Sequence, residues 1–146
     1  MTQENKELLL KDLSARLPYG VNVDIKYSKL NGSSLRLRIC SEGMLPLNTD
    51  LLGLFQEEEI YLKPYFRPMS SMTEEERKEI EELIKSHLPS PDGIINNKGM
   101  DNLLFSVSST SGYLIDWLNA HHFDYCGLIE KGLAIEVTNE HNPYKK

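Results

Sequence analysis

Four side chains in the C-terminal third of the sequence form its densest group of potential metal ligands or catalytic groups, namely His121, His122, Asp124 and Cys126. Imidazole and thiolate bind zinc, and a thiolate beside a histidine can act as a nucleophile. The group lacks the close Cys or His spacing typical of zinc sites, and neighbouring helical residues point about 100° apart. We therefore favour structural roles, with His121 beside Trp117, and keep a small enzyme or metal protein as the alternative.

A catalytic Cys126 would need a lowered thiol pKa and a third orienting group, and neither is visible in the sequence. Cys40 follows a strand pattern and is expected to fill the core. The two cysteines lie far apart and no signal peptide precedes them, so both are expected to be reduced. The sequence also lacks the P-loop, GxGxxG and GxSxG motifs of common nucleotide-binding proteins and hydrolases. We expect no cofactor, and an enzyme is not the favoured interpretation.

Two groups of side chains could instead bind a macromolecule. Arg36 and Arg38 fall on one face of a predicted strand, near Lys26 and Lys29, and could form a small basic patch that binds nucleic acid. The alternative, which we favour, is the polar outer face of a half-buried sheet.

The second group is aromatic and lies on a segment stiffened by prolines. Tyr61, Tyr65 and Phe66, with Met69 and Met72, could anchor a protein contact. The favoured alternative is that these side chains pack the sheet onto the helices, because buried aromatic residues contribute much of the stability of a core.

The chain has 146 residues and a net charge of -6, with acid concentrated in the segments 57–59 and 74–82. This balance favours a protein partner over nucleic acid, because coating a polyanion requires a concentrated basic surface. No apolar run is long enough to span a membrane. We expect a cytoplasmic protein with one domain over residues 1–138 and a flexible tail over 139–146, and the oligomeric state stays open.

The first half of the sequence predicts a helix followed by a small sheet. Thr2 can cap a helix that extends to about Leu17, and Asp12 is among its polar positions. Alternating apolar residues predict strands over 21–27 and 35–39, joined by an Asn-Gly turn, and a third strand over 58–62.

The second half is expected to be mainly helical. Pro64 and Pro68 predict a stiff crossover, and Thr73 stands three residues before Glu76, the spacing of a capping box that starts a helix ending near Leu88. A long loop over 90–101, which could be a lid, precedes a helix containing Trp117, and a short strand is expected over 133–137. The predicted fold is α+β: a small antiparallel sheet, open or barrel-like, packed with about three helices.

Three segments carry a resemblance to a known group. LKPYFRPMSSMTEEE at 62–76, FDYCGLIEKGLA at 123–134 and KDLSARLPYGV at 11–21 resemble short uncharacterised proteins of gut-bacterial phages and integrated mobile elements. In that group the position of Cys126 is commonly Arg, which argues against catalysis by the thiol. The resemblance implies a phage or prophage origin and action inside a bacterial host. Together with the residues above, it predicts an accessory protein that binds a host or phage macromolecule, with a protein favoured over nucleic acid.

Overall fold

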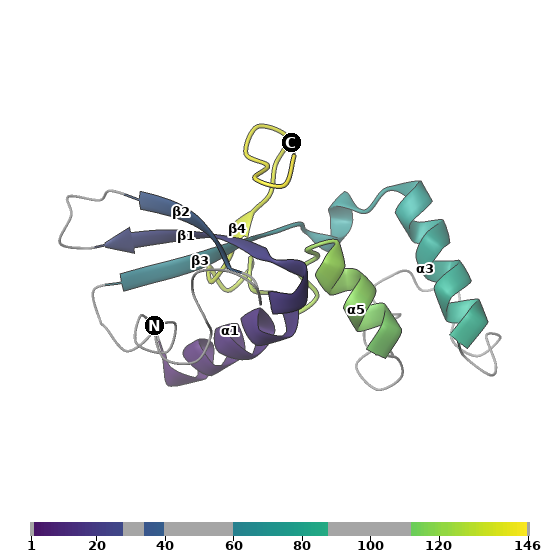
Figure 1. Ribbon diagram of the computed structural model, residues 1–146, viewed down its shortest axis with the longest axis horizontal. Coiled ribbons are helices and arrows are strands. Elements are labelled where there is room, and N and C mark those ends of the chain that lie inside the picture. Colours follow the sequence, from purple (N-terminus) through teal and green to yellow (C-terminus); the bar gives the residue numbers. More distant parts are fainter. Residues whose placement is uncertain (1, 28–33, 40–59, 88–111, 146) are drawn as a thin grey trace.

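The computed structural model describes residues 2–27, 34–39, 60–87 and 112–145 (Figure 1). In chain order the elements are α1 (Gln3–Arg16), η1 (Leu17–Tyr19), β1 (Val21–Tyr27), β2 (Ser34–Ile39), β3 (Ile60–Phe66), η2 (Met69–Ser71), α3 (Glu74–His87), α5 (Gly112–Ala120) and β4 (Ile135–Glu136). The Asn-Gly turn, Cys40, the acidic segment 57–59 and the predicted 90–101 loop lie outside the described residues. No helix within the described ranges is long and apolar enough to cross a membrane.

The four strands form one sheet in the order β2-β1-β3-β4, which confirms an α+β fold. β1 pairs antiparallel with β2 and β3, whereas β3 pairs parallel with β4. The sheet is therefore mixed rather than purely antiparallel, and it is open rather than barrel-like. The parallel pair follows from the long connection through α3 and α5, because parallel neighbours require a crossover.

Helix α1 begins as its sequence predicts, because the side chain of Thr2 accepts a hydrogen bond from the backbone N–H of Asn5 at 3.2 Å. Leu9 and Leu13 point from α1 into a core that also contains Val23 of β1. Figure 1 shows α1 lying along the sheet. Period-two alternation in the strands thus buries one face of the sheet against the apolar side of the helix.

Strand β3 is longer than predicted. The expected crossover from residue 63 onward is wrong, because β3 continues to Phe66 and contains Pro64, which pairs with Val23. Pro64 is the last β3 residue in the ladder with β1, and a proline is tolerated where a ladder ends. The crossover is shorter and consists of Arg67, Pro68 and η2.

The capping box at the start of α3 is confirmed. The N–H of Glu76 donates to the Thr73 hydroxyl at 3.2 Å, and the N–H of Thr73 donates to the Glu76 carboxylate at 2.8 Å. Ile80 and Ile84 of α3 pack with Leu118 of α5 in a second hydrophobic cluster. In Figure 1 this pair of helices lies beyond one end of the sheet.

The C-terminal segment is attached to the sheet through Tyr144. Its hydroxyl donates to the carbonyl of Tyr65 at 2.8 Å and accepts from the N–H of Asn22 at 3.3 Å. The hydroxyl thus bridges β1 and β3 just beyond Pro64. Within the tail that the sequence predicts over 139–146, Tyr144 is therefore attached to the sheet.

Candidate functional site

The face of the sheet opposite α1 carries side chains from both the predicted basic patch and the predicted aromatic group. We call this surface the basic sheet face; its members are Lys26, Arg36, Arg38, Tyr61 and Lys63, and all five are exposed. They come from three neighbouring strands, β1, β2 and β3. The basic patch and the aromatic anchor are thus parts of one surface.

The strand register explains this arrangement. Lys26 lies directly opposite Tyr61, and Asp24 lies opposite Arg36 on one side and Lys63 on the other. Directly opposed residues of an antiparallel pair point to the same face, with Cβ atoms roughly 4.5–5.5 Å apart. The sequence did not indicate Lys63 as a member of this surface, because the predicted third strand ended at residue 62.

Arg36 is held on the face by an aromatic ring. Its guanidinium lies over Tyr65, 5.1 Å from the ring centroid, and donates to the Tyr65 hydroxyl at 3.3 Å. Tyr65 is buried, with an exposed fraction of 6%, and Phe66 is fully buried in the core. These two rings cannot serve as the exposed anchors considered from the sequence, whereas Tyr61 is 54% exposed and can.

Arg38 lies along the backbone at the start of β1. It donates to the carbonyl of Tyr19 at 3.3 Å and passes over Gly20 so closely that a Cβ there would be 2.6 Å from Nε of Arg38. Gly20 also has a φ of 71°, a conformation that glycine adopts without strain. A glycine at this position therefore lets Arg38 fold back while remaining exposed.

The two histidines of the alternative metal or catalytic site have separate partners. His121 stacks on Trp117, with ring centroids 3.9 Å apart, and its Nδ1 lies 2.9 Å from the Trp117 carbonyl. His122 stacks on Tyr144 at 3.8 Å. Burial, followed by the charge of Arg16, lowers the pKa of His122 to about 4, so its ring is neutral near pH 7.

Asp124 and Cys126 also have structural roles. The Asp124 carboxylate accepts from the N–H groups of Leu128 and Ile129 at 2.9 and 2.7 Å, as a cap does. Burial and the nearby Asp12 carboxylate raise the pKa of the Cys126 thiol to about 12. In the described part of the chain, no three His, Cys, Asp or Glu side chains converge as a metal site would require.

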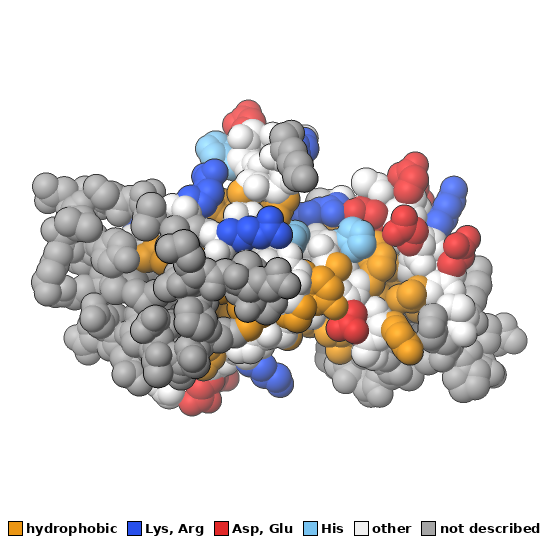
Figure 2. Space-filling model, viewed as in Figure 1, with side chains coloured by type: hydrophobic (Ala, Val, Ile, Leu, Met, Phe, Trp, Pro, Cys, Tyr) orange, Lys and Arg blue, Asp and Glu red, His pale blue; other side chains and the backbone are white. Residues whose placement is uncertain are grey.

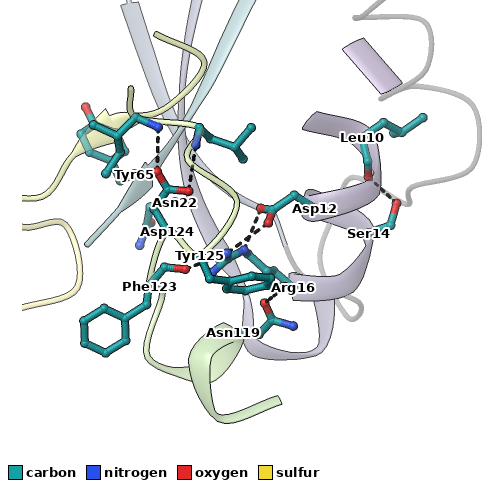
Figure 3. A network of polar contacts seen from close by, with 12 residues as sticks. Leu10, Asp12, Ser14, Arg16, Asn22, Tyr65, Asn119, Phe123, Asp124 and Tyr125 are labelled. Carbon is teal, nitrogen blue, oxygen red and sulfur yellow. Dashed lines mark hydrogen bonds and ion pairs between the residues drawn. The ribbon is translucent and has the colours of Figure 1, made fainter. Parts of the chain in front are cut away.

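A buried polar network, which no sequence pattern indicated, joins α1 to the segment after α5. Arg16 forms an ion pair with Asp12, and one of its Nη atoms donates to the Phe123 carbonyl at 2.8 Å. Figure 3 shows Tyr125 beside this guanidinium, 4.9 Å from it to the ring centroid, with its hydroxyl directed at Asn119. Asp12, one of the polar positions of the predicted helix, is thus buried, and Arg16 accompanies it into the core.

Comparison of the chain with protein-family models, with curated proteins and with solved structures finds no match. The geometry of the basic sheet face is thus the starting point for assigning a function.

Proposed function

We propose that the protein is a non-enzymatic binding domain whose basic sheet face docks an acidic segment of a partner protein. The observation that carries this proposal is that four exposed cations share one face of the sheet with the exposed ring of Tyr61, in a chain with a net charge of -6. With the resemblance described above, the proposal extends to an accessory protein of a phage or mobile element and a partner in its bacterial host.

The chemistry of the face suits a protein interface. Tyrosine and arginine are enriched among the residues that dominate binding energy, and Tyr61 has cations on its own strand and on the neighbouring strand. Lys26 and Lys63 can steer an acidic partner toward the face. The Arg36 side chain is ordered by Tyr65, so less conformational freedom is lost when it binds.

An acidic protein segment fits better than a nucleic acid. Asp24 lies between Arg36 and Lys63 and reduces the positive charge of the face. The acidic side chains of α3, which Figure 2 shows gathered over that helix, would repel a long polyanion. A short acidic segment would contact the cations without approaching α3, which lies beyond the end of the sheet.

The test compares three purified variants as bait in lysate of the bacterial host, followed by binding of the identified partner in purified form. Lys26→Glu/Lys63→Glu reverses two exposed charges on the face, and Lys11→Glu/Lys131→Glu makes the same charge change at exposed positions outside it. Tyr61→Ala removes the exposed ring. We expect the face variants, but not the control, to weaken binding of an acidic protein by about tenfold or more.

Two outcomes would overturn the proposal. Equal binding by the face variants and the control would show that the partner uses another surface. Recovery of nucleic acid, with a steep salt dependence that Lys26→Glu/Lys63→Glu abolishes, would assign the same face to nucleic acid instead.

A further inference from the structure

A second candidate site is a cleft on another part of the molecule, and it does not depend on the proposed function. Three segments form it: the turn from Arg67 to the start of α3, the C-terminal end of α5, and the C-terminal segment that includes Thr138 and Asn142. Its volume is about 840 Å³, within the range of roughly 300–1,000 Å³ for small-molecule sites. All of its lining residues belong to the described part of the chain.

Backbone hydrogen bonds hold the walls of this cleft together. The N–H of Arg67 donates to the His122 carbonyl at 2.8 Å, and the N–H of Asp124 donates to the Arg67 carbonyl at 2.8 Å. The third wall is attached to the sheet by the Tyr144 hydroxyl. A cleft whose walls are fixed in this way is formed before any ligand arrives, so binding requires little ordering.

Three of the neutral polar side chains that line the cleft use an oxygen as an acceptor within the protein. The Thr138 hydroxyl oxygen accepts from the N–H of His141 at 3.2 Å, and the Asn142 amide oxygen accepts from the N–H of Tyr144 at 2.9 Å. The Thr73 hydroxyl oxygen accepts from Glu76 in the capping box. These oxygens already accept hydrogen bonds within the protein. The hydroxyl O–H of each threonine and the amide N–H₂ of Asn142 are therefore the groups that can donate to a ligand.

The charges around the cleft favour an acceptor-rich, anionic ligand. Lys145 lines it beside Asn142 and adds an exposed ammonium group. The electrostatic potential at His122 is positive. Burial lowers the pKa of its imidazole most, and the positive charges of Arg16 and other cations lower it further. Among the lining residues Glu136 is the acid, and it is exposed at the edge of the sheet.

We propose that this cleft binds a small phosphate monoester, whose phosphate oxygens accept hydrogen bonds from Thr138, Asn142 and Lys145. Phosphate oxygens carry negative charge and only accept hydrogen bonds, which matches the donors on this wall. The cleft exceeds the size of a bare phosphate, so the remaining space accommodates the organic part of the molecule.

The proposal is tested by NMR titration of the full chain with glucose 6-phosphate, inorganic phosphate and glucose. We expect saturable shifts at Thr138 and Asn142 with the two phosphate-bearing probes and none with glucose. No saturable shift with either phosphate probe, or equal binding of glucose, would overturn the proposal.

Two conservative substitutions make this test more specific. Asn142→Asp keeps an oxygen that accepts from Tyr144 but replaces the amide donor with a negative charge, and should weaken phosphate binding about tenfold or more. Glu136→Gln removes the one acid of the lining and should tighten binding. The control is Glu140→Gln, which removes an exposed acid near the cleft that does not line it, and should leave the affinity unchanged. Unchanged affinity in both Asn142→Asp and Glu136→Gln would assign the probe to another surface and overturn the proposal.

Discussion

The guanidinium of Arg16 and the carboxylate of Asp12 form an ion pair 2.7 Å long inside the protein, one turn apart on α1. Their side chains are 0% and 1% exposed. Arg16 also lies over the ring of Phe66, 4.1 Å from its centroid, and donates to the carbonyl of Phe123. The pair therefore connects α1, β3 and the segment after α5, which are distant in sequence.

We expect Arg16→Met to lower the free energy of unfolding by about 3–5 kcal/mol, because it leaves the Asp12 carboxylate buried without its partner. Urea unfolding followed by circular dichroism measures this loss. The double variant Asp12→Leu/Arg16→Met removes both charges and should lose less than the sum of the two single variants. Strict additivity would show that the two side chains do not stabilise each other.

The second prediction concerns acid stability and Glu76. Hydrogen bonds from Arg67 lower the pKa of Glu76 below its ordinary value of 4.5. A lowered carboxyl pKa stabilises the fold above the unfolded value, and this stabilisation is lost as the pH falls through the folded pKa. Glu76→Gln should therefore reduce the free energy of unfolding at pH 7 by about 1–2 kcal/mol, and this loss should shrink as the pH falls through the folded-state pKa of Glu76.

The matched control is Glu75→Gln, which makes the same chemical change in the same helical turn at an exposed position. Unfolding titrations across the acid range should show a much smaller effect for this control. Equal effects of the two variants would mean that helix charge, rather than the contacts of Glu76, causes the loss.

The third prediction is that Cys126 reacts slowly with iodoacetamide. Burial, with the nearby charge of Asp12, raises the pKa of this thiol to about 12, so almost none of it is thiolate at pH 8. Peptide mapping by mass spectrometry should show slow modification in the native protein and fast modification in urea. Rapid native modification with a titration near 7 would instead favour the catalytic alternative.

The fourth prediction addresses the bridge made by Tyr144. Tyr144→Phe retains the stacking on His122 but removes the hydroxyl shared by Asn22 and Tyr65, and should cost about 1–3 kcal/mol of stability. Hydrogen exchange of the Asn22 amide should accelerate. Tyr61→Phe, at an exposed ring, is the control and should leave stability within about 0.5 kcal/mol of the native protein.

Local sequence patterns predicted the parts of the fold that depend on near neighbours. The Thr2 cap, the Thr73 and Glu76 capping box and the alternation in β1 all involve residues a few positions apart. These patterns were sufficient for the α+β class and for placing Arg36 and Arg38 on one strand face.

Long-range partners decided the rest. Charged residues one turn apart, like Asp12 and Arg16, usually indicate an exposed helix face, and their burial depends on Phe66 and Phe123. Pro64 suggested the end of a strand, but its ladder with β1 extends up to that residue. The predicted basic patch and the predicted aromatic anchor belong to one surface because the strand register places Tyr61 opposite Lys26. This register could not be read from either segment alone.

The cations of the basic sheet face and the glutamates of α3 lie in different parts of the molecule. The exposed cations of the basic sheet face lie on one side of the sheet, while the exposed glutamates of α3 lie beyond its end (Figures 1 and 2). Such a separation of charge can orient an approaching charged molecule before any contact forms. On the proposed function, an acidic partner would be drawn to the sheet rather than to α3, and its association rate should fall as added salt screens these charges.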